Sequence, residues 1–214
     1  MQVVEDQQDQ AVEAKQGQIK ITVCLSLSGI AEGGEEVYKE FQKQISEMET
    51  NATLGERKCE MGQVGCRGYC SRDVLVDVYV PGEERVTYEK VKPAMVKNIL
   101  NDHIVGGKPF KKAASKEDYY TTIKKQTRVA LAHGGSIDPE NIDDYIQVGG
   151  YDSLKKILST MKPEEVIEEV KKSGLRGKGG GGFVTATKWE KARNAPTDEK
   201  GTRYIMVNGD EGNP

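Results

Sequence analysis

The sequence predicts an α/β protein with more than one domain. Residues 18–102 switch between runs with alternating apolar and polar residues, which indicate strands, and runs with apolar residues at helical spacing. Glycine, proline and lysine interrupt this periodicity at residues 105–109, which indicates a boundary. The length of 214 residues, with 36% hydrophobic and 30% charged residues, is sufficient for two modest hydrophobic cores.

The elements of the first half follow in order from these patterns. Residues 18–23 alternate as a half-buried strand, and residues 35–48 place Val37, Phe41, Ile45 and Met48 on one helical face. Strands are then expected at residues 58–63, 74–80 and 85–88, and a helix at residues 92–102 closes the unit. The order β-α-β-β-β-α is typical of a small α/β domain of the thioredoxin-like type.

Four segments are expected along the chain. Residues 1–17 are acidic and glutamine-rich, which predicts a disordered tail and is unlike a signal peptide. The expected ranges are 18–106 for the thioredoxin-like domain, 107–126 for a linker and 127–214 for a second domain.

The second half contains a glycine-rich loop between two helices. The first helix is expected at residues 162–172, where proline and acids begin the run and lysines end it. Six of the nine residues from Gly174 to Gly182 are glycine, and Arg176, Lys178 and Lys188 add positive charge. Backbone without Cβ atoms can approach an anion and present consecutive N–H groups, so the loop is predicted to bind phosphate. A flexible glycine linker is the structural alternative.

Neither common phosphate fingerprint explains this loop. The residues after Gly179 lack the Lys-Ser/Thr pair of a Walker A loop. Gly177, Gly179 and Gly182 satisfy G-x-G-x-x-G, but a helix precedes them where a Rossmann site requires a strand. An apolar strand is expected at residues 204–207, followed by Asn208, Asp210 and Glu211, which are suited to hydrogen-bonding a cofactor at the end of a strand. Together these features predict a nucleotide or flavin site.

The cysteines all lie in the first half, at Cys24, Cys59, Cys66 and Cys70. Without a signal sequence before them, they are more typical of metal ligands than of a secreted disulfide framework. Cys66 and Cys70 flank a glycine whose N–H group is suited to cluster sulfurs. Cys59 is expected to be a small buried hydrophobe, because an extended segment would place it about 20 Å from the Cys66 loop.

The two histidines indicate no catalytic role. His103 follows a predicted helix, where capping of its C-terminus or surface exposure is expected. His133 precedes two glycines and is expected in a turn.

The segment GLRGKGGGGFVTATKW, followed by VNGDEGNP, resembles the NADH-binding FMN flavoprotein subunit of respiratory complex I, a family shared with NAD-reducing hydrogenases and formate dehydrogenases. The resemblance covers about residues 127–214 and implies the start of a complex I flavoprotein-type FMN-binding α/β domain. It implies that Gly177 and Gly179, with Gly180 beside them, approach FMN, that Lys188 contacts it, and that Phe183 stacks on NADH. It also implies that Asn208, Asp210 and Glu211 hydrogen-bond the flavin.

Two positions depart from that family. Asn213 stands where the family usually has an acid, and Lys191 stands where an aromatic residue is frequent. Both changes fall on the dinucleotide side of the site, so FMN is a firmer expectation than NAD(H).

The first half resembles the thioredoxin-like [2Fe-2S] ferredoxin domain that accompanies complex I and the hydrogenases. In that family a Cys-x4-Cys pair opens the ligand motif and Cys-x3-Cys ends it. Here Cys24, Cys66 and Cys70 match, but Gly29 stands at the second position, with Ser28 beside it. Three alternatives remain open: Ser28 supplies an oxygen ligand, Cys59 reaches in, or the domain holds no cluster.

The expected function is an electron-input flavoprotein subunit or fragment, an oxidoreductase that passes electrons between NAD(H) and iron–sulfur clusters of partner subunits through FMN. The chain is expected to be incomplete, because a flavin site normally closes from several strands. One alternative is a non-catalytic docking module with a clusterless domain, and another is a phosphate-binding protein unrelated to flavin.

Composition and charge limit the partners and the location. The net charge of −3, with acids and bases interleaved, argues against nucleic-acid binding. Apolar runs are too short for a membrane span. The expected location is cytoplasmic, with any membrane association provided by partner subunits.

Overall fold

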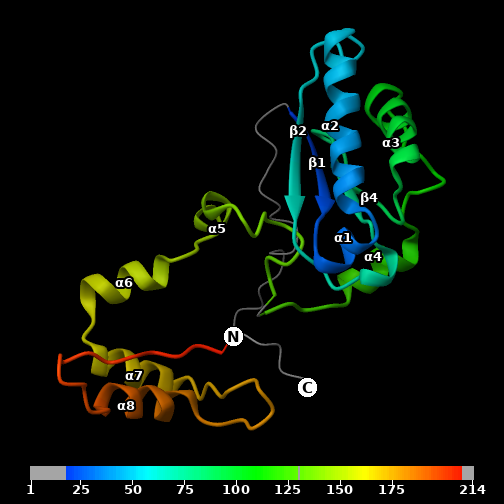
Figure 1. The fold of residues 1–214 in the computed structure, drawn as a ribbon. Helices are drawn as coiled ribbons and strands as arrows, with labels where there is room; N and C mark the ends of the chain where they lie inside the picture. The colour runs from blue at the N-terminus through cyan, green and yellow to red at the C-terminus, as the bar shows by residue number, and fades with distance from the viewer. Residues whose placement is uncertain (1–17, 130, 209–214) are drawn as a thin grey trace. The chain divides into compact units, whose positions relative to one another are not determined.

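The fold is taken from a computed structural model, which describes residues 18–129 and 131–208. The described chain falls into two compact units that divide between Gly149 and Gly150. The predicted tail at residues 1–17 lies outside the described residues, and the domain boundaries expected from the sequence stay predictions. Figure 1 shows the course of the chain.

The first unit is built on a four-stranded sheet of order β2-β1-β3-β4. Strands β1 (Ile19–Cys24) and β2 (Cys59–Val64) are parallel, with Ile19 opposite Cys59 and Cys24 opposite Val64. Strand β3 (Val76–Tyr79) is antiparallel to β1, and β4 (Val86–Tyr88) is antiparallel to β3. This topology places the carboxyl ends of β1 and β2, and the loops that follow them, at one edge of the unit.

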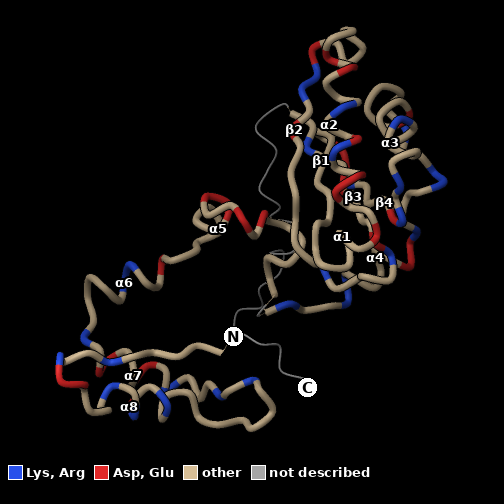
Figure 2. The backbone as a smooth tube through the Cα atoms, in the orientation of Figure 1, with Lys and Arg blue, Asp and Glu red and all other residues tan. Residues whose placement is uncertain are grey.

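Helices complete the first unit. These are α1 (Leu27–Ala31), α2 (Gly34–Thr50), α3 (Pro93–Ile99), α4 (Glu117–Lys124) and α5 (Ile142–Gln147), with the 3-10 helix η2 (Cys70–Arg72) and the π-helical turn η3 (Leu100–Val105). The observed elements confirm the predicted β-α-β-β-β-α order, with bounds shifted by a few residues. Figure 2 shows acidic and basic residues interleaved along this unit.

The core lies between the sheet and helices α2 and α3. Val37, Phe41, Ile45 and Met48 of α2 are all buried in it, as their helical spacing predicts. Inward residues of β1 and β3 pack against the same cluster. All six residues of β1 are buried, which corrects the expected half-buried strand: β1 lies inside the sheet between β2 and β3, and both of its faces are covered.

His103 belongs to this core, which corrects the expectation of a capping or surface residue. Its side chain is 2% exposed, and Nδ1 lies 2.9 Å from the hydroxyl oxygen of Tyr88. The reason is local: the helical path continues through η3 beyond the predicted end at residue 102, and this turns His103 inward. His133 lies in a turn, as predicted.

The second unit consists of α6 (Asp152–Thr160), α7 (Pro163–Lys172) and α8 (Thr185–Asn194) with their connecting loops. Helix α7 confirms the predicted capped helix, and Glu165 accepts a 2.7 Å hydrogen bond from the backbone N–H of Lys162 at its start. Helices α7 and α8 pack together, and Arg193 Nη2 lies 3.0 Å from Glu164 Oε1.

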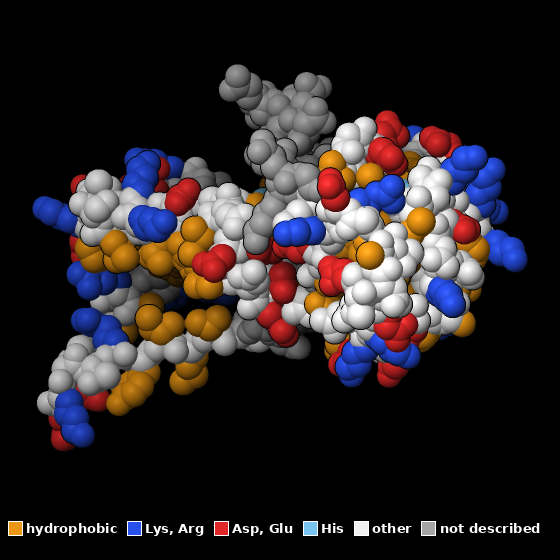
Figure 3. All heavy atoms as spheres, turned by 90° about the horizontal axis from the view of Figure 1, so that it is seen from above, with side chains coloured by type: hydrophobic (Ala, Val, Ile, Leu, Met, Phe, Trp, Pro, Cys, Tyr) orange, Lys and Arg blue, Asp and Glu red, His pale blue; other side chains and the backbone are white. Residues whose placement is uncertain are grey.

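The predicted strand at residues 204–207 is wrong. These residues pair with no other strand in the described chain, and Tyr204, Ile205, Met206 and Val207 are each more than three-quarters exposed. An apolar run becomes a strand only where a neighbouring strand accepts its backbone hydrogen bonds. Figure 3 shows that hydrophobic side chains reach the surface in several places on the face it presents.

Across residues 18–129 and 131–208, no helix combines the length and the apolar character that a membrane span requires.

Candidate functional site

The glycine-rich loop is a closed hairpin between α7 and α8. Arg176 and Val184 form an antiparallel bridge, and Gly177 N–H donates to the carbonyl oxygen of Phe183 at 2.8 Å. Thr185 N–H donates to the carbonyl oxygen of Leu175 at 3.0 Å. The predicted path from helix to helix is confirmed, and these bonds make the loop a defined structure where a flexible linker would have none.

The tip of this hairpin is open to a ligand. A Cβ atom added at Gly179, Gly180, Gly181 or Gly182 would meet no atom within 4 Å. Gly180 and Gly182 have φ values of +88° and +56°, in the left-handed region that favours glycine. The backbone N–H groups of the tip are therefore accessible to an anion at close range.

Two lysines of α8 lie beside the loop. The Nζ atoms of Lys188 and Lys191 lie 5.8 Å and 5.6 Å from the centroid of the Phe183 ring, within the range of cation–π contacts. The ideal Cβ position at Gly177 lies 3.4 Å from Lys188 Nζ, so this ammonium group sits against the loop backbone. The structure thus brings Gly177, Phe183 and Lys188 together, and adds Lys191, which appeared in the sequence only as a departure from the family.

Other residues of the predicted flavin site lie elsewhere on the loop, after it, or outside the described residues. Arg176 is turned to the loop itself, where Nη1 donates to the carbonyl oxygen of Gly182 at 3.2 Å. Lys178 is exposed on the loop. Asn208 is described but belongs to no strand, whereas Asp210, Glu211 and Asn213 lie outside the described residues.

A second candidate site is formed by the cysteines at the carboxyl ends of β1 and β2. Cys66 and Cys70 are exposed, with their Sγ atoms 3.5 Å apart, and Gly68 N–H donates to Cys66 Sγ at 3.2 Å. This hydrogen bond is the glycine-loop contact expected from the sequence. The hydrogen bond to Cys66 also raises the pKa of Cys70 above its usual value.

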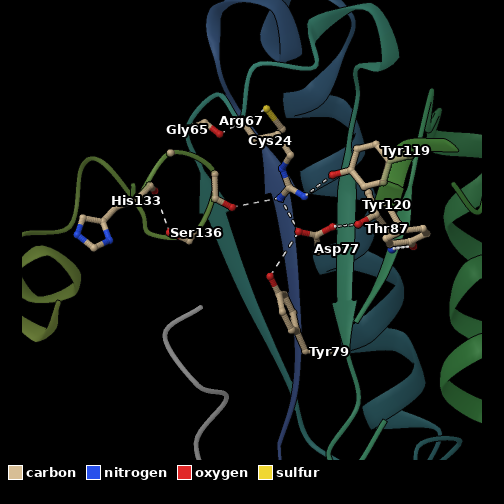
Figure 4. Close-up of polar contacts among 12 residues, drawn as sticks. Cys24, Gly65, Arg67, Asp77, Tyr79, Thr87, Tyr119, Tyr120, His133 and Ser136 are labelled. Atoms are coloured by element: carbon tan, nitrogen blue, oxygen red, sulfur yellow. Dashed lines mark hydrogen bonds and ion pairs between the residues drawn. The ribbon is translucent and has the colours of Figure 1, made fainter. Parts of the chain in front are cut away.

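Cys24 lies beneath this loop. It is 1% exposed, and its thiol lies 3.3 Å from Ser26 Oγ and 3.7 Å from the carbonyl oxygen of Gly65. Burial raises the pKa of the Cys24 thiol and so favours its neutral form. Figure 4 shows Cys24 and Gly65 near each other.

The position of the missing ligand is filled by backbone. A Cβ atom at Gly29 would lie 2.2 Å from the carbonyl oxygen of Cys24, so no larger residue fits there in this conformation. Ser28 is half-buried in α1, and the hydroxyl that contacts Cys24 belongs to Ser26, the N-cap residue of α1. Sequence reasoning missed Ser26, although serine immediately before a short helix is the usual signal for a cap.

Cys59 begins β2 at the end remote from Cys66, as the sequence predicts. It is half-buried and packs on the main core, and burial raises its pKa to about 11. It therefore does not complete a ligand set with Cys66 and Cys70.

A buried carboxylate lies close to the cysteines. Asp73 is 6% exposed, and neither of its carboxylate oxygens has a hydrogen-bond partner among the described residues. Its negative charge contributes to the raised pKa values of both Cys24 and Cys70. Additional thiolate charge is unfavourable beside it.

Tested against a [2Fe-2S] cluster, these residues do not fit a four-ligand set. The fourth position is occupied by Gly29, Cys24 is buried as a hydrogen-bonded thiol, and Asp73 adds negative charge. The described part of the chain contains no group of three or more candidate ligands arranged around one metal position.

The cysteine loop is anchored by Arg67, a residue that sequence reasoning missed. Its guanidinium forms a buried ion pair with Asp77, and its Nη1 donates to the hydroxyl of Tyr119 at 3.2 Å. Burial opposes the charge on Asp77, but Arg67 outweighs burial and holds the pKa of this carboxyl below its usual value. Thr87 also donates to Asp77 at 2.6 Å, as Figure 4 shows. No sequence motif marks this network, because its members come from four separate segments.

The described chain combines an α/β domain on a mixed four-stranded sheet with a glycine hairpin whose tip is open. Comparison with known families agrees: residues 10–103 match the thioredoxin-like [2Fe-2S] ferredoxin family, and residues 170–214 match the Nuo51 FMN-binding domain. The resemblance to the FMN flavoprotein family with a ferredoxin-type domain, and the predicted fold class, are confirmed. The two family descriptions name FMN and a [2Fe-2S] cluster, although the ligand set of this chain departs from that of the cluster family.

Individual relatives are components of oxidoreductases. The chain is 53% identical over 94 residues to the NADP-reducing hydrogenase subunit HndC of Solidesulfovibrio fructosivorans, a match that covers 44% of this chain and 18% of that protein. It is 49% identical over 74 residues to a subunit of the NADH-quinone oxidoreductase of Aquifex aeolicus, covering 35% of this chain and 16% of that protein. The chain thus spans less than a fifth of the length of either relative.

Among solved structures, the wild-type thioredoxin-like [2Fe-2S] ferredoxin of Aquifex aeolicus is similar to 47% of this chain and 98% of its own, with 23% identity and a TM-score of 0.40.

Proposed function

We propose that this chain is all or part of the electron-input flavoprotein subunit of a multisubunit oxidoreductase, which passes electrons between NAD(H) and iron–sulfur clusters through FMN. Its domains would be the thioredoxin-like domain at residues 18–106, a linker at 107–126 and part of the FMN-binding domain at 127–214. Its partners would be the iron–sulfur subunits of the complex, and its location the cytoplasm.

The hairpin between α7 and α8 is the observation that carries this proposal. It combines an open glycine tip, two ammonium groups and an exposed aromatic ring within one short segment, and this segment lies in the Nuo51 FMN-binding match. Accessible N–H groups suit a phosphate, and an aromatic ring suits a flat heterocycle.

The residues divide into proposed roles. The backbone of Gly177, Gly179 and Gly180 would approach FMN, with Lys178 and Lys188 supplying charge. Phe183 would stack on the nicotinamide nucleotide. The polar residues after the 204–207 segment would hydrogen-bond the flavin: Asn208, Asp210 and Glu211. Bound FMN would supply hydride acceptance and single-electron release, and the protein would orient it.

Replacement of Lys188 by Ala tests this assignment. Loss of a charge-assisted contact costs about 1.5–3 kcal/mol, so FMN should bind at least about tenfold more weakly. The measurement is the flavin absorbance retained by the native complex containing the chain, together with the Kd for added FMN. Lys172→Ala is the matched control, because Lys172 is an exposed lysine of the same unit paired with Glu169 on α7.

Equal FMN affinity in wild type, Lys188→Ala and Lys172→Ala would remove Lys188 from the site. A native complex without flavin would overturn the proposed function.

The second candidate is a non-catalytic docking module with a clusterless thioredoxin-like domain. The specific observation in its favour is the backbone contact that closes the fourth ligand position at Gly29. A colourless native complex that still contains the partner subunits would favour this candidate over electron input.

A further inference from the structure

Cys66 and Cys70 are positioned to bond to each other. Both side chains are exposed, and their Sγ atoms are 3.5 Å apart. A disulfide needs a separation of about 2.05 Å, so closure requires sulfur movement on the order of 1.5 Å. Rotation of two exposed side chains can supply a movement of this size.

The loop between the two cysteines is held in place. Arg67, the residue after Cys66, is anchored to Asp77 and Tyr119 and also donates to the carbonyl oxygen of Gly135 at 3.2 Å. Gly68 has a φ of +81° and donates its N–H to Cys66 Sγ. On the far side, Cys70 begins η2. The sulfurs are therefore held close together by contacts that do not involve a metal.

The surroundings favour a neutral product. Asp73, three residues after Cys70, is 6% exposed, and neither of its carboxylate oxygens has a hydrogen-bond partner in the described chain. Thiolate ligation of a metal would add negative charge there, whereas a disulfide carries none. The backbone contact at Gly29, which leaves no room for a side chain at the fourth ligand position, also disfavours a cluster.

We propose that Cys66 and Cys70 form a redox-active dithiol that exchanges two electrons with low-molecular-weight disulfides. One cysteine sulfur attacks a small disulfide, releases one of its two thiols and retains the other in a mixed disulfide with the protein. The second cysteine displaces the remaining thiol, so that the protein gains one S–S bond. The two cysteine protons and two electrons leave in the two small thiols, and the reverse reaction reduces the protein. This proposal does not depend on the flavin site.

Peptide mapping of the full chain tests it directly. Trypsin cleaves after Lys58, Arg67 and Arg72, so Cys66 and Cys70 fall on separate peptides, residues 59–67 and 68–72. The protein is treated with oxidised glutathione, and its free thiols are then alkylated. Most protein molecules should yield the two peptides joined by a disulfide, with a mass two hydrogen atoms below the sum of the separate peptides. Reduction with dithiothreitol before alkylation should return both peptides to the separate, alkylated form.

Two variants make the assignment specific. Cys59 shares the first peptide with Cys66, so Cys59→Ser must retain the joined product. Cys70→Ser must lose it and carry glutathione on Cys66.

Three results would each overturn the proposal. One is that both peptides remain separately alkylated after glutathione treatment. Another is that joining requires Cys59. The last is that the anaerobically isolated chain holds iron and sulfide in equal amounts, and that Cys66→Ser loses both.

Discussion

At the scale of single residues, the first unit depends on charges and polar groups that its sheet buries. Arg67 and Asp77 are 6% and 0% exposed as side chains and form an ion pair. Removing one partner of such a pair leaves the other charge buried without compensation. Because Arg67 also positions the cysteine loop, this pair links the stability of the domain to the geometry of its candidate redox site.

Asp77→Asn should destabilise the first unit by about 3–5 kcal/mol, because Arg67 stays buried as an unpaired cation. Glu35→Gln is a control, because the pair of Glu35 with Lys39 is exposed and spans one helical turn, so it should have a much smaller effect. Urea unfolding followed by circular dichroism measures both. Similar midpoints for the two variants would contradict the importance given to the buried pair.

His103 gives the first unit a pH dependence. Burial lowers its pKa in the folded state below the usual 6.5, and Glu83 opposes this effect only partly. As the pH falls below about 6.5, the unfolded chain binds a proton that the folded chain does not, so the free energy of unfolding should decrease. His103→Gln should flatten this slope between pH 6.5 and the lower folded-state pKa. Denaturant titrations at several pH values measure it, and equal slopes in both proteins would refute the role of His103.

At the scale of elements, the turn that leads from β1 into α1 packs against Gly29, a glycine inside that helix. A methyl group on Gly29 would meet the carbonyl oxygen of Cys24 at 2.2 Å, which requires the backbone to move. The same turn carries the Ser26 cap, which accepts from Gly29 N–H at 3.2 Å and contacts the Cys24 thiol. At the second ligand position of the ferredoxin pattern, this chain thus has a packed backbone contact and no ligand side chain.

Gly29→Ala should therefore destabilise the first unit by about 1–3 kcal/mol, as overpacking typically does. Gly65→Ala is the matched control in the neighbouring loop, because its added methyl group would lie 3.6 Å from the nearest atom, an ordinary contact. Thermal unfolding of both variants provides the comparison. A Gly29→Ala protein as stable as Gly65→Ala would show that the turn can open enough to admit a side chain, and with it a fourth ligand.

At the scale of the whole molecule, the sequence predicts those helices and strands that depend on the local spacing of apolar residues. The α2 face, the strands β1 and β2, and the capped helix α7 follow from apolar spacing and terminal residues. The Arg67–Asp77–Tyr119 network does not, because its contacts join residues 10 and 52 positions apart and exist only in the folded chain. The sequence does not predict the backbone contact at Gly29 either, because this contact depends on the direction of the Cys24 carbonyl group.

In the glycine hairpin, the sequence predicts some features and not others. Its helix-to-helix path and the place of Lys188 are readable from the sequence, whereas the turn of Arg176 toward Gly182 is not. For residues 204–207, apolar composition predicts a strand, but a strand also needs a partner, which composition does not supply.

The two units should differ strongly in local stability. In the first unit, β1 is wholly buried and α2 contributes a full apolar face to the core. In the second, α6 and α7 contain no buried residue, and Leu154 and Leu158 of α6 are 47% and 78% exposed. Few buried apolar contacts mean that opening costs little free energy.

Hydrogen exchange on the isolated 214-residue chain should therefore separate the two units. Amides of β1 and α2 should exchange only through global unfolding, whereas those of α6 should exchange through local opening and respond little to mild denaturant. The Asp77→Asn variant provides the control, because it should accelerate exchange in β1 and leave α6 unchanged. Equal protection of α6 and β1, or a common response to Asp77→Asn, would mean that the chain folds as one cooperative body and that the exposed α6 face is covered in solution.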